Sequence, residues 1–247
     1  MKAEPKYRNP PIQETICEVH FDLSEPLMLQ KIESLKDVWS KEYPEQKIVQ
    51  ERKVEFHIST EGIQTQEGDL GHRLICKTAD GKRLVQLSGL FYAANQLRPY
   101  PGWEESFRDT IRKRSEDVQK KIGPLKFKRV GLRYINRIDV PQVPLVWEEW
   151  FQLKLPVPEM PGSRQGDFQM QFHRALAEGR RFTINVAALA SPDRKVSPVI
   201  LDLDLIWEGA AREPSELGQV LEQVHGPHRL VFEGYLRDKV RKLFDVS

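Results

Sequence analysis

The sequence has few of the features that identify secreted, metal-binding or membrane proteins. It holds two cysteines among 247 residues, Cys17 and Cys76, and each lies inside an apolar run. Two isolated thiols form neither a disulfide framework nor a metal motif, so we expect both to be buried. No stretch approaches the roughly 18 apolar residues of a membrane span, and the N-terminal stretch lacks the apolar core of a signal peptide. We therefore expect a cytoplasmic protein without membrane association.

An excess of charge of one sign is also missing. The net charge is +2, with 30% charged and 39% hydrophobic residues. This balance is typical of a globular chain, and it argues against strong non-specific DNA binding by the whole molecule. Arg112, Lys113, Lys120 and Lys121 on a predicted helix are interspersed with acidic residues. They form either a phosphate contact or, as we favour, a solvated face.

The usual catalytic motifs are absent as well. The chain has no GxSxG, GxxxxGK[ST] or GxGxxG pattern and no HExxH, so the common hydrolase, P-loop, dinucleotide and zinc-protease signatures are lacking. His225 and His228 are close together but have no third ligand nearby in the sequence. We expect no metal and no cofactor, and a protein that is not an enzyme.

Hydrophobic periodicity predicts the same order of elements twice. The first half is predicted to contain strands at 14–23, 46–60, 72–88 (a hairpin around Asp80-Gly81) and 90–97, a helix from Ser24 as N-cap, and a helix at 103–123. The second half is predicted to contain strands at 126–140, 167–189 (a hairpin around Glu178-Gly179) and 198–209, with helices at 146–153, 214–224 and 228–244. Gly226-Pro227 is predicted to separate the last two helices, whose final stripe is Phe232, Leu236, Val240 and Leu243.

These elements predict an α+β protein with two similar halves, residues 1–123 and 124–247. The halves are expected to share one curved antiparallel sheet with the long helices on one face. This order resembles the duplicated saddle of TATA-box-binding-type domains, and it also fits a helix-grip fold. The likeness concerns topology and carries no function.

The strand at 129–140 is unusually polar. Arg133 and Arg137 point to one face, while Asn136 points to the other. Asp202 and Asp204 share one face of their own strand, about 7 Å apart. Three explanations remain open for the aspartates: a solvated face, a cross-strand ladder with the arginines, and a metal or acid–base pair. For the arginines we predict an inner strand, with Arg133 paired to Asp202 and Arg137 to Asp204.

Several segments resemble a sporadically distributed, uncharacterised bacterial family of about this length. The matching residues are Asn9-Pro10-Pro11-Ile12 with Glu14, Gln86, Asn95, the segment 99–104 (PYPGWE), the segment 132–137 (LRYINR), the segment 201–204 (LDLD), and His225 with Phe232-Glu233. The resemblance implies a bacterial cytoplasmic protein in a defence or mobile-element context, and it implies no reaction.

The sequence therefore favours a non-catalytic binding protein whose partner is another protein. The alternative is a protein that binds or cleaves nucleic acid with Asp202, Asp204, Arg133 and Arg137. The candidate polar cluster, structural or partner-binding, is Arg133, Asn136, Arg137, Asp202, Asp204 and His225. The sequence does not indicate an oligomeric state.

Overall fold

The computed structural model describes residues 7–59, 62–155, 167–189 and 195–245, and it shows an α+β protein built on one antiparallel sheet. The nine strands are β1 (Ile12–Phe21), β2 (Glu45–Ser59), β3 (Gly62–Lys77), β4 (Arg83–Ser88), β5 (Phe91–Leu97), β6 (Phe127–Val140), β7 (Phe168–Ala175), β8 (Arg180–Ala188) and β9 (Ser197–Arg212). Their order in the sheet is β2-β3-β4-β5-β1-β6-β9-β8-β7. The first strand of each half, β1 and β6, therefore meet at the middle.

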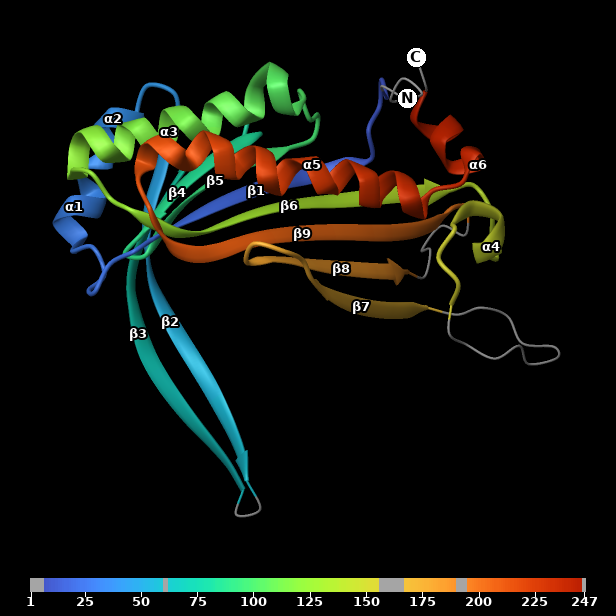
Figure 1. The fold of residues 1–247 in the computed structure, drawn as a ribbon, viewed down its shortest axis with the longest axis horizontal. Coiled ribbons are helices and arrows are strands. Elements are labelled where there is room, and N and C mark those ends of the chain that lie inside the picture. Colours follow the sequence, from blue (N-terminus) through green and yellow to red (C-terminus); the bar gives the residue numbers. More distant parts are fainter. Residues whose placement is uncertain (1–6, 60–61, 156–166, 190–194, 246–247) are drawn as a thin grey trace.

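Helices cover one face of this sheet. They are α1 (Leu29–Glu33), α2 (Leu35–Trp39), the π-helical turn η1 (Trp103–Phe107), α3 (Arg108–Ile122), α4 (Trp147–Trp150), the 3-10 turn η2 (Pro214–Glu216), α5 (Leu217–Tyr235), α6 (Asp238–Arg241) and the 3-10 turn η3 (Lys242–Phe244). The two long helices, α3 and α5, lie side by side over the sheet (Figure 1). No helix of the described residues is long and apolar enough to cross a membrane.

The core lies between the sheet and these helices. Alternate residues of each strand face it, because successive side chains of a strand point to opposite faces. Trp103, Phe107 and Ile111 enter it from η1 and α3, as their spacing predicts, and Cys17 and Cys76 are buried in it. Asn136 also points to this side. The period-2 prediction for β6 is therefore confirmed.

Two predicted helix boundaries are wrong. The first helix does not start at Ser24, since α1 begins at Leu29. The Leu27 N–H instead donates to the Gly89 carbonyl across 2.8 Å, which ties this segment to the β4–β5 turn.

Gly226-Pro227 does not end a helix, because α5 continues through it to Tyr235. A proline removes one backbone donor, and the buried Val224 and His228 on either side hold both turns against the sheet. The helix then ends before Leu236, so Leu236 and Val240 are buried from a separate segment and Leu243 is exposed rather than part of a stripe.

The described ends of the chain are tied to each other. The Arg8 and Asn9 N–H groups donate to the carbonyls of Asp245 and Phe244, both across 3.2 Å. The Tyr7 hydroxyl donates to Glu233 across 2.7 Å. Opposite this junction, β2 and β3 extend beyond the rest of the sheet as a long hairpin that bends toward the side away from α3 and α5 (Figure 1).

Candidate functional site

The sheet face opposite α3 and α5, called the open face below, carries a row of polar side chains with one member on each strand. We call this row the polar ladder. Its members, in strand order across the sheet, are Glu51, Arg73, Gln86, Asn95, Glu14, Arg133, Asp202, Asn185 and Gln171. Asp, Asn and Glu are poor strand residues, so a row of them on adjacent strands requires an explanation.

The N-terminal half of the ladder is a chain of hydrogen bonds between neighbouring strands. Arg73 on β3 pairs with Glu51 on β2 and donates to the Gln86 Oε1 on β4 across 3.1 Å. Gln86 Nε2 donates to Asn95 Oδ1 on β5 across 3.0 Å, and Asn95 Nδ2 donates to Glu14 Oε1 on β1 across 2.7 Å. Each side chain is thereby fixed by the strand beside it.

The C-terminal half continues this arrangement from β6 to β7. Arg133 binds Asp202 with two hydrogen bonds, Nε to Oδ1 at 2.8 Å and Nη2 to Oδ2 at 2.7 Å. Asn185 donates to the same carboxylate across 3.0 Å, and Gln171 donates to Asn185 across 2.7 Å. His173 then contacts the Gln171 Oε1 at 3.0 Å. Both oxygens of the Asp202 carboxylate therefore accept hydrogen bonds from nitrogen donors.

The charges of Glu14 and Arg133 join the two halves of the ladder at the centre. Glu14 lies diagonally across the β1–β6 pair from Arg133, because Glu14 faces Ile135 and Ile16 faces Arg133. The hydrogen bonds to Asp202 are the largest cause that raises the pKa of Arg133, and the charge of Glu14 adds to the effect. The guanidinium is thus held in its charged form from both sides.

A second group of polar side chains lies beside the ladder on β1 and β6. Arg129 contacts Glu18 at 3.4 Å and also contacts His20, whose ring stacks on Phe91 with 4.9 Å between ring centroids. The hydrogen bond to His20, followed by the nearby Arg129 charge, lowers the pKa of Glu18. Arg73 lies over the same Phe91 ring at 5.0 Å.

Asp204 has a different environment from Asp202. Burial raises its pKa to about 6, although Arg133 and Arg129 act in the opposite direction. Arg133 lies directly opposite it on β6, and Gly131 lies diagonally, where an added Cβ would be 3.8 Å from the Arg129 Nη2 and 3.9 Å from the Asp204 Oδ1. Among the described residues no side chain donates a hydrogen bond to Asp204. The centre of the open face therefore presents a half-buried carboxylate acceptor.

The predicted ion pairs are half correct. β6 is an inner strand, and the Arg133–Asp202 pair is confirmed. The Arg137–Asp204 pair is wrong: Arg137 faces Ile200 across the β6–β9 pair and binds Asp139 on its own strand at 2.9 Å. The cause is the register, which places Asp204 directly opposite Arg133.

The candidate cluster from the sequence is divided between the two faces. Asn136 lies on the helix side, where its Nδ2 donates to the Leu201 carbonyl across 2.9 Å. His225 lies on α5 and stacks on Trp103 with 4.3 Å between centroids, and burial lowers its pKa. Arg133, Arg137, Asp202 and Asp204 lie on the open face. In the described part of the chain, no group of three His, Cys, Asp or Glu side chains is placed to hold a metal.

The sequence does not predict most of the ladder. Glu14, Gln86 and Asn95 stand out only as motif residues, and nothing in the sequence distinguishes Glu51, Arg73, Asn185 or Gln171. Their common signal is a polar residue at an outward position of each strand. One such residue is ordinary, and its meaning depends on which strands lie side by side.

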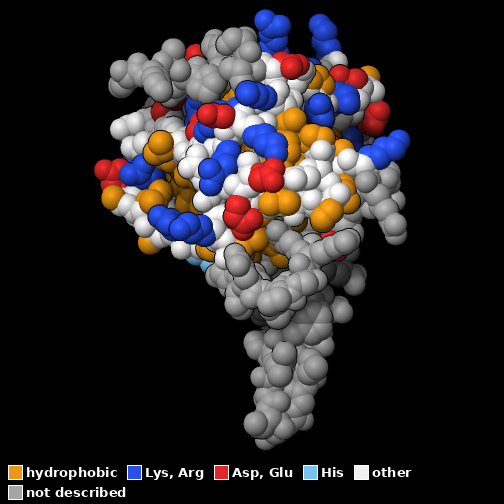
Figure 2. Space-filling model, turned by 90° about the vertical axis from the view of Figure 1, so that its right-hand side faces the viewer, with side chains coloured by type: hydrophobic (Ala, Val, Ile, Leu, Met, Phe, Trp, Pro, Cys, Tyr) orange, Lys and Arg blue, Asp and Glu red, His pale blue; other side chains and the backbone are white. Residues whose placement is uncertain are grey.

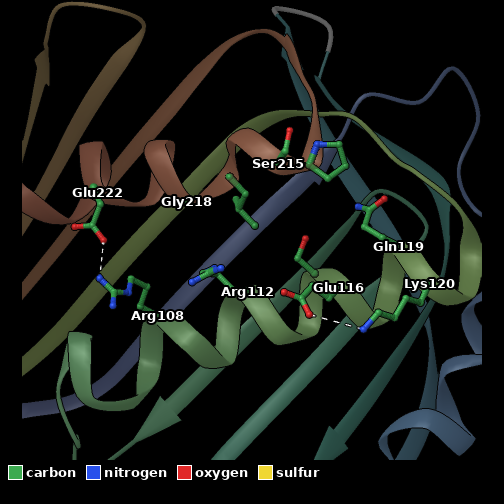
Figure 3. A pocket seen from close by; sticks show the side chains of 11 residues that line it. Arg108, Arg112, Glu116, Gln119, Lys120, Ser215, Gly218 and Glu222 are labelled. Carbon is green, nitrogen blue, oxygen red and sulfur yellow. Dashed lines mark hydrogen bonds and ion pairs between the residues drawn. The ribbon is translucent and has the colours of Figure 1, made fainter.

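A hollow of about 600 Å³ lies on the other side of the molecule, between α3 and the start of α5 (Figure 3). Arg108 and Glu222 face each other across it, and Glu116 pairs with Lys120 on its edge. These four charges are therefore paired within the wall of the hollow. Arg112, which the sequence offered as a phosphate contact, lies near Asp109.

Charges of both signs are mixed at the end of the molecule where α4 and α6 lie. Lysine and arginine side chains alternate there with aspartate, glutamate and apolar side chains (Figure 2). Val143 and Val146 beside α4 and Leu243 in η3 are exposed. This view shows no field of one sign that would attract a polyanion.

No protein-family model and no curated protein matches the chain. Among solved structures, the S. pombe Pct1 RNA triphosphatase in complex with the Spt5 CTD aligns with 96% of this chain and 88% of its own chain, at 7% identity and a TM-score of 0.13. A likeness at that level carries no argument about fold or function. The open face is therefore interpreted from its own geometry.

Proposed function

We propose that this is a non-catalytic binding protein that holds a segment of a partner protein against the open face of its sheet. The observation that carries the proposal is the polar ladder, which crosses all nine strands on the face that α3 and α5 leave uncovered. Side chains that are already fixed by their neighbours lose little freedom when a partner arrives, and this lowers the cost of binding. The motif resemblance adds the setting, a bacterial cell and a defence or mobile-element context.

The charge pattern supports a protein partner over nucleic acid. Arg73, Arg129, Arg133 and Arg137 on the open face are each paired with a carboxylate. Nucleic-acid binding draws its affinity from cations that replace counterions along the phosphates, and paired arginines supply little of this. A metal-dependent cleavage site at Asp202 would have to displace the hydrogen bonds that its two oxygens accept from Arg133 and Asn185.

The partner's chemistry follows from Asp204 and its surroundings. This carboxylate is ionised at neutral pH and lacks a hydrogen-bond donor among the described residues. A backbone amide, a lysine or an arginine of the partner would supply the donor. The ladder itself offers amide donors and acceptors at the half-buried Gln86 and Asn185.

Site-specific photo-crosslinking tests this proposal. A benzophenone amino acid replaces Ile135, at the centre of the open face, and as a matched control it replaces Gln219, which is exposed on α5. In bacterial cells that make the protein, we expect a protein adduct from position 135 that Asp204→Asn weakens. Equal adducts from both positions, or none from position 135, contradict the proposal.

Fluorescent single- and double-stranded DNA and RNA test the alternative in the same preparation. We expect no saturable binding at 50 mM salt, a concentration at which a phosphate-binding surface has a high affinity for nucleic acid. Binding that weakens steeply with salt and that Arg133→Ala reduces would instead support the nucleic-acid function.

We also propose that the two halves arose by duplication, as in the saddle of TATA-box-binding-type domains. In both halves the first strand lies at the β1–β6 boundary and the other strands follow outward in reverse order of the sequence. The order is β5, β4, β3 and β2 beside β1, and β9, β8 and β7 beside β6. An experimental structure in which residues 14–121 and 126–244 do not superpose strand for strand would refute the duplication.

A further inference from the structure

Among the described strands, β7 is the last of the sheet and pairs on one side only, with β8. The Leu176 N–H donates to the Arg180 carbonyl across 2.8 Å, so even-numbered positions of this strand direct their backbone groups toward β8. Gln169, Gln171 and His173 therefore direct their N–H and C=O groups outward. Within the described residues, these outward groups have no strand beside them (Figure 1).

The opposite edge of the sheet is protected, and this edge is not. β2 carries Glu45, Lys47 and Glu51 and has a bulge between Glu51 and Arg52. Charges and bulges of this kind are the usual devices that prevent a sheet edge from pairing with another chain. β7 has the sequence FQMQFHRA, with a single charged residue at Arg174, no proline and no register shift in its pairing.

Both faces of β7 are also incomplete. Phe168, Met170 and Phe172 point to the helix side and are only half-buried, although Phe168 and Phe172 pack against the core. On the open face, Gln171 is the last member of the polar ladder. A strand added outside β7 would cover Phe168, Met170 and Phe172 and extend the ladder. For this, its apolar residues must face the helix side and its polar residues the open face.

A second copy of β7 meets this requirement. In an antiparallel pair centred on Gln171, Gln171 faces its own counterpart, Gln169 faces His173, and Met170 faces Phe172. All three pairs keep polar side chains on one face and apolar side chains on the other. Arg174 faces Phe168, so no two like charges are opposed. Gln171 uses one amide N–H for Asn185 and keeps the second for its counterpart.

We propose that two copies of this chain pair through β7 across a two-fold axis, so that one sheet and one polar ladder run through both. Such an interface is isologous and closes the exposed edge of each copy. The proposal is independent of the partner on the open face, because it concerns the backbone edge of β7.

Sedimentation equilibrium over a wide range of concentration tests the pairing. We expect wild type to have twice the mass of the chain. Gln171→Pro removes an outward N–H and leaves the bonds to β8, so we expect the mass to fall by half. Gln171→Ala is the matched control, because it keeps the N–H and should keep the dimer.

Cysteine crosslinking gives a second measurement, which remains informative even if the Gln171→Pro variant does not fold. Gln171→Cys places two thiols across the axis, at a hydrogen-bonded pair whose Cα separation of about 5.5 Å suits a disulfide. We expect a covalent dimer on mild oxidation and none from Lys47→Cys at the other edge, while the buried Cys17 and Cys76 stay unreactive. A monomeric wild type, a dimer that Gln171→Pro leaves intact, or equal crosslinking at both edges would overturn the proposal.

Discussion

At the scale of single residues, Arg133 and Asp202 combine good geometry with unequal burial. The arginine side chain is 43% exposed, whereas that of the aspartate is 8% exposed. Exposed ion pairs contribute about 0–1 kcal/mol, and breaking a fully buried pair costs about 3–5 kcal/mol. The pair lies between these limits, because solvent screens the guanidinium but hardly reaches the carboxylate.

A double-mutant cycle on Arg133→Ala and Asp202→Ala should therefore give a coupling free energy of about 1–2 kcal/mol in denaturant unfolding. Arg137 and Asp139 provide the control, since both side chains are 47% exposed. Their coupling should be near zero. If the two cycles give the same value, the bidentate pair contributes no more than a surface contact.

Asp204 makes stability depend on pH in the direction opposite to a salt-bridged acid. Its pKa is about 6 in the folded state and 3.8 ordinarily, so the folded protein holds the proton more tightly. The ionised carboxylate therefore leaves the free energy of unfolding unchanged below about pH 4. Above about pH 6 it lowers this free energy by the full amount. Asp204→Asn removes this cost and should stabilise the protein by about 2 kcal/mol more at pH 8 than at pH 4. Denaturant unfolding at the two pH values measures this, and an unchanged difference contradicts it.

At the scale of elements, α5 is the clearest departure from what its sequence predicts. An added Cβ at Gly226 would meet no atom within 4 Å, and this glycine has no positive φ. Gly226→Ala should therefore stabilise the helix by about 0.5–1 kcal/mol, as in any helix interior. If Gly226 lay in a linker between two helices, Gly226→Ala would not increase the stability of the protein. Thermal and denaturant unfolding distinguish the two.

Gly179 in the β7–β8 turn is the contrasting control. Its φ is +70°, and an added Cβ would lie 2.2 Å from the Glu208 carbonyl oxygen. Gly179→Ala should therefore destabilise the protein by more than about 1 kcal/mol. A stabilising effect there would mean that the turn differs from this structure.

The strands show what a sequence can and cannot predict. Alternation in β6 and β9 gave the correct faces for Arg133, Asn136 and Asp202, because side-chain direction is a local property of each strand. The predicted pairing of Arg137 with Asp204 is wrong, since register depends on the partner strand. The sequence also does not predict the continuation of β3 back to Gly62, because it depends on pairing with β2 more than on its own composition.

At the scale of the whole molecule, the junction of β1 and β6 joins the two halves into one sheet. Neither strand is an edge: β1 lies between β5 and β6, and β6 lies between β1 and β9. The ladder depends on this neighbourhood, which no single segment encodes. The order of elements predicted two α+β halves, but it did not predict that their first strands would be neighbours.

Residues 1–123 and 124–247, expressed separately, should therefore fail to stay soluble as monomers, because each fragment exposes β1 or β6 as an unprotected apolar edge. Co-expression should restore a stable complex with the circular dichroism of the intact chain. Two fragments that are each monomeric and cooperatively folded would show that the halves are independent domains.

The hydrogen bonds between residues 8–9 and 244–245 bring the described ends of the chain within reach of a short peptide linker. We therefore expect the fold to tolerate termini at another position of the chain. A circular permutant with the ends joined and new termini in the Asp80-Gly81 turn keeps every strand pairing of the sheet. Such a rearrangement presents the same open face from a chain that is read in a different order.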